Sequence, residues 1–255
     1  MEIFAEKKIR EAMAEWHDLP LILLSSVDST NVFLKERVRS GDLSAPCLVL
    51  ADYQKAGRGR LGRTFVSPPG TGLYMSLLLR PESGAEIQKM TVLAAVAVCL
   101  ALEEITPLRP KIKWVNDLFV KGRKVCGILA EYVENQVIIG IGVNLQTPPG
   151  GFPPEAGIAG ALDIPLSREE LAGKIAGNLL AGMKNLSDSE LMDAYRARMP
   201  LIGREITYLQ SGQEKNARVT GVANDGGLIV ITDGKEEILR SGEISLGSYS
   251  FSGLE

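Results

Sequence analysis

Histidine is almost absent from this sequence of 255 residues, because His17, near the start of the chain, is the only one. A Ser-His-Asp triad could be built only on this residue, and a zinc site made of several histidines is excluded. We interpret His17 as a surface or boundary residue of the first helix. The chemistry of the protein is therefore expected not to depend on an imidazole base.

Cysteine is scarce as well, and Cys47, Cys99 and Cys126 lie far apart in the sequence. Such an odd, dispersed set builds neither a disulfide framework nor a CxxC metal or redox site, which favours a reducing compartment. The apolar run over residues 92–102 is too short to span a bilayer, and residues 1–10 lack the apolar core of a signal peptide. We therefore expect a cytoplasmic protein that does not associate with a membrane.

A basic surplus is also missing, since 28 Lys and Arg residues stand against 31 Asp and Glu residues, a formal net charge of −3. Domains that bind nucleic acid usually carry such a surplus to neutralise phosphates. Aromatic residues, which would stack on bases, make up only 5% of the chain. A nucleic-acid-binding module is therefore disfavoured, and any anion site must come from a local cluster of basic residues.

The hydrophobic patterning that is present divides the chain into two parts. Up to about residue 202, stretches of helical composition are interspersed with short apolar strands, whereas from Gly203 short alternating segments are separated by turns such as Asp225-Gly226-Gly227. We predict an α/β domain (α+β type) over residues 1–202 and a small β-barrel over residues 203–255. The predicted helices cover residues 2–16, 32–38 and 85–105 and two further segments that begin at the capping boxes of Ser167 and Ser187. The predicted strands cover residues 19–24, 47–51, 73–79, 111–114, 124–132 and 136–143, then 205–209, 217–222, 228–232, 236–240 and 243–246.

The most distinctive local segment is the loop Gly57-Arg58-Gly59-Arg60-Leu61-Gly62-Arg63 between two predicted strands. Glycines let a backbone bend and approach a ligand closely, and arginines supply permanent charge and paired donors for carboxylate or phosphate oxygens. The loop therefore predicts an anion site. A solvated basic turn or an RNA-contacting patch is the alternative. The loop is neither a P-loop nor a Rossmann fingerprint, because the GxxxxGK[ST] pattern is missing and a strand follows it.

Clustered Arg and Lys residues without histidine suit the joining of a carboxylic acid to ATP. A carboxylate is already a nucleophile at neutral pH, so its attack on an α-phosphate needs no general base. The obstacle is the approach of one anion to a polyanion, which positive charge in a dry pocket removes. Hydrolysis by nucleophilic catalysis is much less well suited to such a site.

Five segments together resemble the motif series of biotin protein ligases, in the same order and with similar spacing. They are Asp28-Ser29-Thr30-Asn31, Tyr53 to Arg63, Lys113-Trp114-Val115-Asn116-Asp117-Leu118, Lys124 to Glu131 and Gly140-Ile141-Gly142-Val143-Asn144-Leu145. The run Arg240 to Leu246 also resembles the end of the C-terminal module of that family. The resemblance therefore extends over nearly the whole chain.

The resemblance implies a mixed β-sheet flanked by helices (the class II synthetase-like biotin/lipoate ligase fold), followed by a small SH3-like β-barrel. It implies an ATP-dependent ligase that converts biotin to biotinyl-5′-AMP and transfers biotin to a lysine of a biotin carboxyl carrier protein of a carboxylase. Mg²⁺ would be carried with ATP, near Asn144, rather than held at a fixed protein site. The family further implies a homodimer. Because the Asp28 motif lies one helix and one strand from the start, we expect no N-terminal DNA-binding domain and no DNA partner.

The resemblance also assigns roles to matching positions. The expected biotin-binding residues are Ser29, Thr30, Asn31, Gln54, Gly57, Arg58, Gly59, Arg60 and Lys124. The expected nucleotide-binding residues are Arg58, Arg60, Phe65, Lys113, Asn116 and Asn144. Lys124, Arg58, Arg60 and Asp117 are expected to be catalytic, with Lys124 on the biotin carboxyl group and the α-phosphate, and Asp117 orienting the incoming lysine.

Several of these positions also have simpler interpretations. Ser29 could cap a helix, and Asn116-Asp117 could form only a turn. Trp114 fits a core position, and Gly127, Gly140 and Gly142 fit close packing. Two positions depart from the family pattern: Val115 stands where proline is common, and Phe65 where tryptophan is common. Neither change removes a charge or a donor.

Two other functions remain open. A lipoate or other acyl ligase of the same fold would need the same positive charges, but a plain acyl chain has no use for the amides of Asn31 and Gln54. A biotin-sensing protein without catalysis is the second alternative, and the presence of Lys124, Arg58 and Arg60 favours an enzyme.

Overall fold

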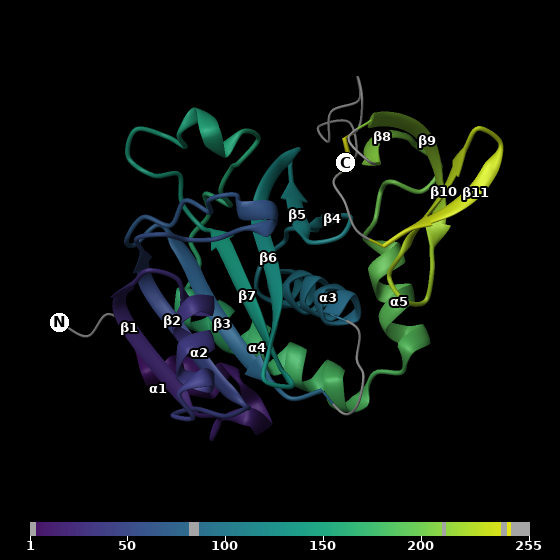
Figure 1. Cartoon of the computed structure of the whole chain (residues 1–255). Helices are drawn as coiled ribbons and strands as arrows, with labels where there is room; N and C mark the ends of the chain where they lie inside the picture. Colours follow the sequence, from purple (N-terminus) through teal and green to yellow (C-terminus); the bar gives the residue numbers. More distant parts are fainter. Residues whose placement is uncertain (1–3, 82–86, 211–212, 241–243, 246–255) are drawn as a thin grey trace.

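A seven-stranded mixed sheet organises most of the molecule (Figure 1). The structure is a computed structural model, and it describes residues 4–81, 87–210, 213–240 and 244–245. Strand order across the sheet is β1-β2-β3-β7-β6-β5-β4. Strands β1 and β2 are parallel, and the other neighbouring pairs of this sheet are antiparallel. The strands are β1 (Leu21–Val27), β2 (Cys47–Gln54), β3 (Gly72–Leu79), β4 (Lys111–Lys113), β5 (Asp117–Val120), β6 (Arg123–Val133) and β7 (Gln136–Asn144).

Helices cover both faces of this sheet, which confirms the predicted fold class. The helices are α1 (Glu6–Ala12), α2 (Thr30–Arg39), α3 (Ile87–Ile105), α4 (Arg168–Asn185) and α5 (Asp188–Ala197). The apolar residues of α1, α3 and α4 share the main core with one face of the sheet, and Leu34 and Val38 of α2 pack on the opposite face. The alternation of side chains along a strand assigns residues to these two faces. On β7, Ile139 and Ile141 belong to the main core, and Ile138 belongs to the α2 side.

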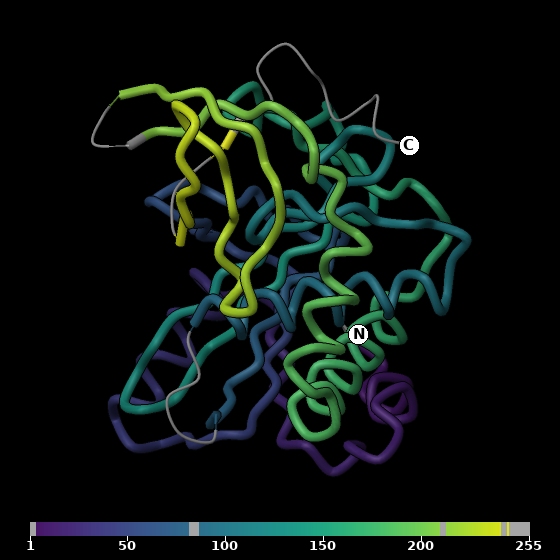
Figure 2. The backbone as a smooth tube through the Cα atoms, turned by 90° about the vertical axis from the view of Figure 1, so that its right-hand side faces the viewer, coloured from purple at the N-terminus to yellow at the C-terminus, as the bar shows by residue number. Residues whose placement is uncertain are grey.

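The second sheet lies at the other end of the molecule from the N-terminal helix, as the two views at right angles show (Figures 1 and 2). It is antiparallel, in the order β11-β10-β9-β8-β12. Its strands are β8 (Glu205–Gln210), β9 (Gln213–Val222), β10 (Leu228–Thr232), β11 (Lys235–Leu239) and β12 (Ile244–Ser245). The turn between β9 and β10 fastens this sheet to the rest of the protein, because the indole N–H of Trp114 donates to the Gly226 carbonyl at 2.9 Å.

Most predicted elements form close to their predicted bounds, and the capping box at Ser187 is complete. There the Ser187 hydroxyl accepts from the Glu190 N–H, and the Glu190 carboxylate accepts from the Ser187 N–H at 2.9 Å. The first helix is shorter than predicted, because Ala14 adopts a left-handed φ of 53° and separates α1 from a 3₁₀ turn at Ala14–Trp16. Strand β5 was not predicted, since its four residues directly follow a turn sequence. Residues 2–3, 85–86, 243 and 246 of the predicted elements lie outside the described residues.

Candidate active site

A cavity of about 800 Å³ opens on the α2 face of the large sheet, where α2 no longer covers the strands. Farther along this face, Leu78 and Ile138 are apolar and pack beneath α2. At the cavity the same face of β6 and β7 carries Gly127, Gly140 and Gly142 instead. The volume lies within the range of about 300–1,000 Å³ that is typical of small-molecule sites. The exchange of large apolar side chains for glycine therefore creates the hollow in the sheet surface.

The glycine floor is needed for close packing. Gly127 and Gly142 are cross-strand partners, and a Cβ atom at position 142 would lie 2.4 Å from the ring of Phe65. A Cβ atom at Gly140 would lie 2.3 Å from Oδ1 of Asn31. The packing interpretation of these glycines therefore holds. Phe65 lies on this floor, so its ring forms part of the cavity wall.

One end of the cavity is polar and uncharged. Parallel pairing places Val27 of β1 opposite Gln54 of β2, which brings the start of α2 next to the Gln54 amide. The N–H of Thr30 donates to Gln54 Oε1 at 2.9 Å, and the Thr30 hydroxyl lies 3.2 Å from the same oxygen. Ser29 is the N-cap residue of α2, but its hydroxyl accepts no hydrogen bond from the described helix backbone. Side-chain capping therefore does not explain the serine at this position.

The arginine loop forms one wall at the other end of the cavity. It folds into a narrow hairpin, in which the Gly59 N–H donates to the Arg63 carbonyl at 2.7 Å and the Phe65 N–H donates to the Gly57 carbonyl at 2.9 Å. Left-handed Leu61 and Gly62, with φ of 54° and 75°, form the tip. The cavity is lined along this loop by Arg58, Gly59, Arg60 and Arg63. This arrangement concentrates guanidinium groups along one wall of a cavity, in a chain with a net negative charge.

Two lysines contribute positive charge from the facing strands. Lys113, at the end of β4, and Lys124, near the start of β6, both line the cavity. Lys124 Nζ forms an ion pair of 2.8 Å with Oδ1 of Asp117, and both side chains are largely buried. Asn116 lies beside them and is held by the protein, because its Nδ2 donates to the Ile128 carbonyl and its Oδ1 accepts from Arg60. Asn116 and Asp117 therefore do more than form a turn.

The segment over residues 153–158, where no helix or strand is predicted, closes the side of the cavity next to Lys124. The Lys124 N–H donates to the Ile158 carbonyl at 3.0 Å, and the Gly160 N–H donates to the Lys124 carbonyl at 2.9 Å. These bonds hold the segment against β6. The lining residues that were not proposed as site residues are Arg63, Thr64, Val66, Met75, Trp114, Gly127, Ile128, Leu129, Gly140, Ile141, Gly142, Pro153, Glu155, Ala156, Gly157, Ile158 and Ile244. Many of these residues are apolar or are glycines, so their types give no indication of a binding role in the sequence. Arg63 is different, because it belongs to the arginine loop.

The structure brings most of the expected site residues together, with two exceptions. Gly57 and Asn144 are not among the described residues that line the cavity. Gly57 instead permits a tight backbone approach, since a Cβ atom there would lie 2.3 Å from the Phe65 carbonyl oxygen. Asn144 is buried at the end of β7, and its Nδ2 donates to the Gly160 carbonyl at 2.9 Å. A ligand contact by Asn144 therefore stays a prediction.

The structure also shows where Val115, which departs from the family pattern, and the scarce histidine and cysteine residues lie. The peptide bond between Trp114 and Val115 is cis, and the Val115 carbonyl accepts from the Tyr195 hydroxyl at 3.3 Å. Trp114 is buried, as its core interpretation predicts, and it also borders the cavity. His17 is exposed next to the first 3₁₀ turn, as expected. The three cysteines are free and buried, and burial raises the pKa of the Cys47 thiol to about 11.

Two family models match the chain, and they define its class. Residues 23–144, which contain most of the cavity, match the Biotin/lipoate A/B protein ligase family. Residues 201–247 match the Biotin protein ligase C terminal domain. The first model places the fold and most of the cavity in the class of biotin and lipoate protein ligases, and the second describes the C-terminal domain of biotin protein ligases.

Individual relatives agree with both models. The chain is 31% identical to the bifunctional ligase/repressor BirA of Escherichia coli over 245 residues, which covers 89% of this chain and 74% of that protein. It is 30% identical to the biotin–[acetyl-CoA-carboxylase] ligase of Paracoccus denitrificans, covering 88% of this chain and 100% of that protein. The match to BirA of Bacillus subtilis, at 42% identity, covers 39% of that longer protein. The biotin protein ligase of Aquifex aeolicus, solved in complex with biotin and ATP, superposes with a TM-score of 0.75 at 31% identity, covering 89% of this chain and 97% of that one. The chain belongs to the biotin protein ligase family.

Proposed function

We propose that this protein adenylates biotin with ATP and transfers the biotinyl group to a specific lysine of a biotin carboxyl carrier protein. The observation that carries the proposal is the cavity itself, in which an uncharged polar end meets a strongly cationic end. The polar end offers donors and acceptors to a neutral ureido ring, and the cationic end offers positive charge to a carboxylate and a triphosphate. The names of the relatives, which include a biotin–[acetyl-CoA-carboxylase] ligase, support the same substrates.

In the first half-reaction, a carboxylate oxygen of biotin attacks the α-phosphorus of ATP, and the bond from that phosphorus to pyrophosphate breaks. Arg58 and Arg60 on the loop, together with Lys124, would hold the two anions together and stabilise the charge that develops on the phosphate oxygens. Phe65, on the glycine floor, offers its ring to the adenine. No proton has to be removed in this step, in keeping with a cavity that contains no histidine.

In the second half-reaction, the amine of the acceptor lysine attacks the carbonyl carbon of the adenylate, and AMP leaves. The attacking amine must be neutral and loses a proton as the amide forms. Asp117 is a carboxylate at the cavity wall, paired with Lys124, and could orient this amine. As the new bond between the lysine nitrogen and the acyl carbon forms, the bond from that carbon to the phosphate oxygen of AMP breaks. The products are an amide on the acceptor lysine, free AMP and a proton.

In this scheme Mg²⁺ enters the cavity bound to the nucleotide. Bound to the triphosphate, Mg²⁺ neutralises part of the phosphate charge. The arginine and lysine side chains of the cavity would hold the nucleotide itself.

In the described part of the chain, no helix is long and apolar enough to cross a bilayer.

The test is ATP–pyrophosphate exchange with the purified protein, Mg²⁺ and one of three acids: biotin, lipoate or octanoate. Exchange with biotin alone, followed by labelling of a purified biotin carboxyl carrier domain, is the expected result. Exchange with lipoate or octanoate but not with biotin would overturn the proposal in favour of a sister ligase. Biotin binding without exchange would instead establish a sensing protein.

A further inference from the structure

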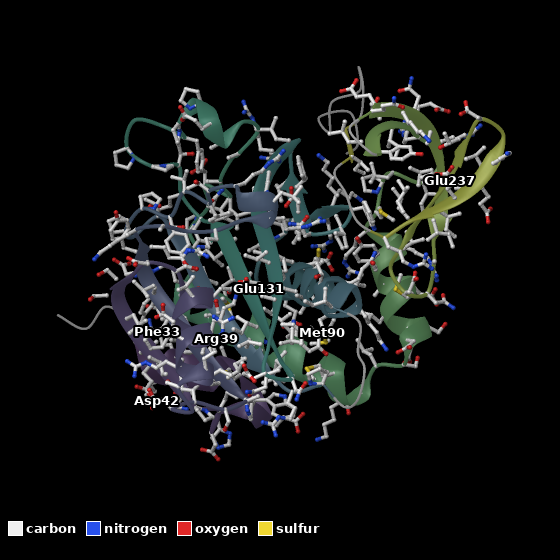
Figure 3. The ribbon with its side chains drawn as sticks, in the orientation of Figure 1. Phe33, Arg39, Asp42, Met90, Glu131 and Glu237 are labelled. Atoms are coloured by element: carbon white, nitrogen blue, oxygen red, sulfur yellow. The ribbon has the colours of Figure 1, made fainter. Side chains whose placement is uncertain are left out.

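A charged pair lies immediately behind the polar end of the cavity. It consists of Glu131 on β6, labelled in Figure 3, and Lys35 on α2. The two side chains are 24% and 22% exposed, so water solvates them only in part. Burial alone would raise the pKa of Glu131, but hydrogen bonds from Lys35 and Asn31 and the nearby charge of Arg58 outweigh it, and the pKa lies below its ordinary value. Glu131 is therefore an ionised carboxylate that can only accept hydrogen bonds.

The amide of Asn31 is held by this carboxylate. Its Nδ2 donates to Glu131 Oε2 at 2.9 Å and to the Leu129 carbonyl at 3.2 Å. Both Nδ2 protons are thus directed at acceptors of β6. On the other side of the amide, Oδ1 lies 2.6 Å from the hydroxyl of Ser76. Asn31 and Ser76 are both buried, so alternative partners in solvent are not accessible.

The orientation of Asn31 is transmitted toward the cavity. The Ser76 hydroxyl also lies 2.6 Å from the hydroxyl of Thr30. Ser76 has one hydroxyl proton, and Asn31 Oδ1, which can only accept, takes it, so the contact between Ser76 and Thr30 uses the Thr30 proton. Since Gln54 Oε1 accepts from the Thr30 N–H at 2.9 Å, its Nε2 is left to donate, and one of its protons goes to the Ser67 hydroxyl at 2.9 Å. Asn31, Ser76 and Thr30 therefore connect Glu131 to the amide of Gln54, and the bond to Gln54 comes from the Thr30 N–H. An amide that could turn over would present the opposite polarity.

We propose that Glu131 is a positioning residue that sets which groups donate and which accept at the polar end of the cavity, and so contributes to recognition of the acid. It does so by holding Asn31 in one amide orientation. The inference deepens the proposed function and rests on it for the identity of the acid. The competing explanation is that the Glu131–Lys35 pair only stabilises the fold.

Glu131→Gln separates these explanations, because glutamine has one acceptor oxygen where the carboxylate has two. Lys35 and Asn31 both require an acceptor there, so one of them must turn away. Glu103→Gln is the matched control: Glu103 is 20% exposed, is paired with Arg198, and is not among the described residues of the cavity. Lys35→Met is a second control, since it removes the ion pair and leaves the Asn31 contact in place.

The first readout is the side-chain NH₂ signals of Asn31 in ¹H–¹⁵N spectra of the protein without ligand, assigned by their loss in Asn31→Asp. We expect them to shift and exchange faster with solvent in Glu131→Gln and to stay unchanged in Glu103→Gln. Since the glutamine of Glu131→Gln can keep its oxygen on Asn31 and turn Lys35 away, Glu131→Leu, which has no acceptor, is the deciding variant. Unchanged Asn31 signals in Glu131→Leu would overturn the inference. This readout needs no substrate, so it remains decisive even where the proposed function fails.

The second readout is steady-state pyrophosphate exchange. We expect Glu131→Gln to raise the KM for biotin about tenfold, the loss expected from one or two misdirected hydrogen bonds, with kcat and the KM for ATP within about twofold of wild type. Both controls should keep the wild-type KM for biotin. A Glu131→Gln variant with lowered stability and an unchanged KM would show that the pair is only structural. A wild-type protein that neither binds biotin nor exchanges with it would instead reject the proposed function.

Discussion

Gly140→Ala tests whether the floor of the cavity is built as tightly as the geometry requires. The added Cβ atom would lie 2.3 Å from Oδ1 and 2.9 Å from Cγ of Asn31. Asn31 cannot move aside at low cost, because Glu131, Leu129 and Ser76 hold its amide. Overpacking of this kind costs about 1–3 kcal/mol, and each broken hydrogen bond adds about 1 kcal/mol. The sum is about 2–4 kcal/mol.

For a chain of this size, that loss lowers the midpoint of thermal unfolding by roughly 5–15 °C. The matched control is Gly221→Ala on β9, where the added Cβ atom would meet only Ile229 Cδ1 at 3.6 Å, an ordinary contact. Thermal unfolding followed by circular dichroism measures both variants. The KM for biotin should rise in Gly140→Ala alone. Equal melting of Gly140→Ala, the control and wild type would refute the reasoning.

Three further changes probe the charges and the junction of the two sheets. Lys124→Ala should lower the rate of pyrophosphate exchange by about 100-fold or more, because it removes a positive charge that stabilises the negative charge developing on the phosphate. The circular dichroism spectrum of this variant should stay native. The pKa of Glu131 is lowered in the folded state, so its contribution to stability is present above the ordinary value of 4.5 and is lost as the pH falls through the lowered value. Urea unfolding should therefore show a gap between wild type and Glu131→Gln that shrinks as the pH falls from about 7 toward about 3. Trp114→Phe removes the donor to the buried Gly226 carbonyl and should cost about 1–2 kcal/mol in the same urea assay.

Each of these expectations has a contrary result. Exchange by Lys124→Ala within a factor of about three of wild type would remove this residue from the catalytic assignment. A gap between wild type and Glu131→Gln that widens in acid would mean that the pKa is raised rather than lowered. Unchanged stability of Trp114→Phe would mean that the indole bond does not fasten the C-terminal sheet.

Much of the fold was accessible from local patterns. Short apolar runs mark β3 and β7, and the sequence Ser187-Asp188-Ser189-Glu190 forms the capping box that it predicts. The turn at Asp225-Gly226-Gly227 joins two antiparallel strands, as a hairpin signal should. These features depend on residues within a few positions of one another, so the chain itself carries the information. Strand β5 escaped prediction because it begins at Asp117, within the turn-like sequence Asn116-Asp117.

For the site, too, some features follow from the sequence and others only from the tertiary structure. The sequence alone determined that cationic residues gather in a glycine-rich loop, that a single histidine leaves little scope for imidazole chemistry, and that five motifs resemble those of biotin protein ligases. Only the tertiary structure decided that Phe65 lies on Gly142, that residues 153–158 close the cavity, and that Asn31 is held by Glu131, 100 positions away. Such contacts depend on which strands become neighbours in the sheet. No short stretch of sequence records that pairing, because it is selected by the burial of the whole core.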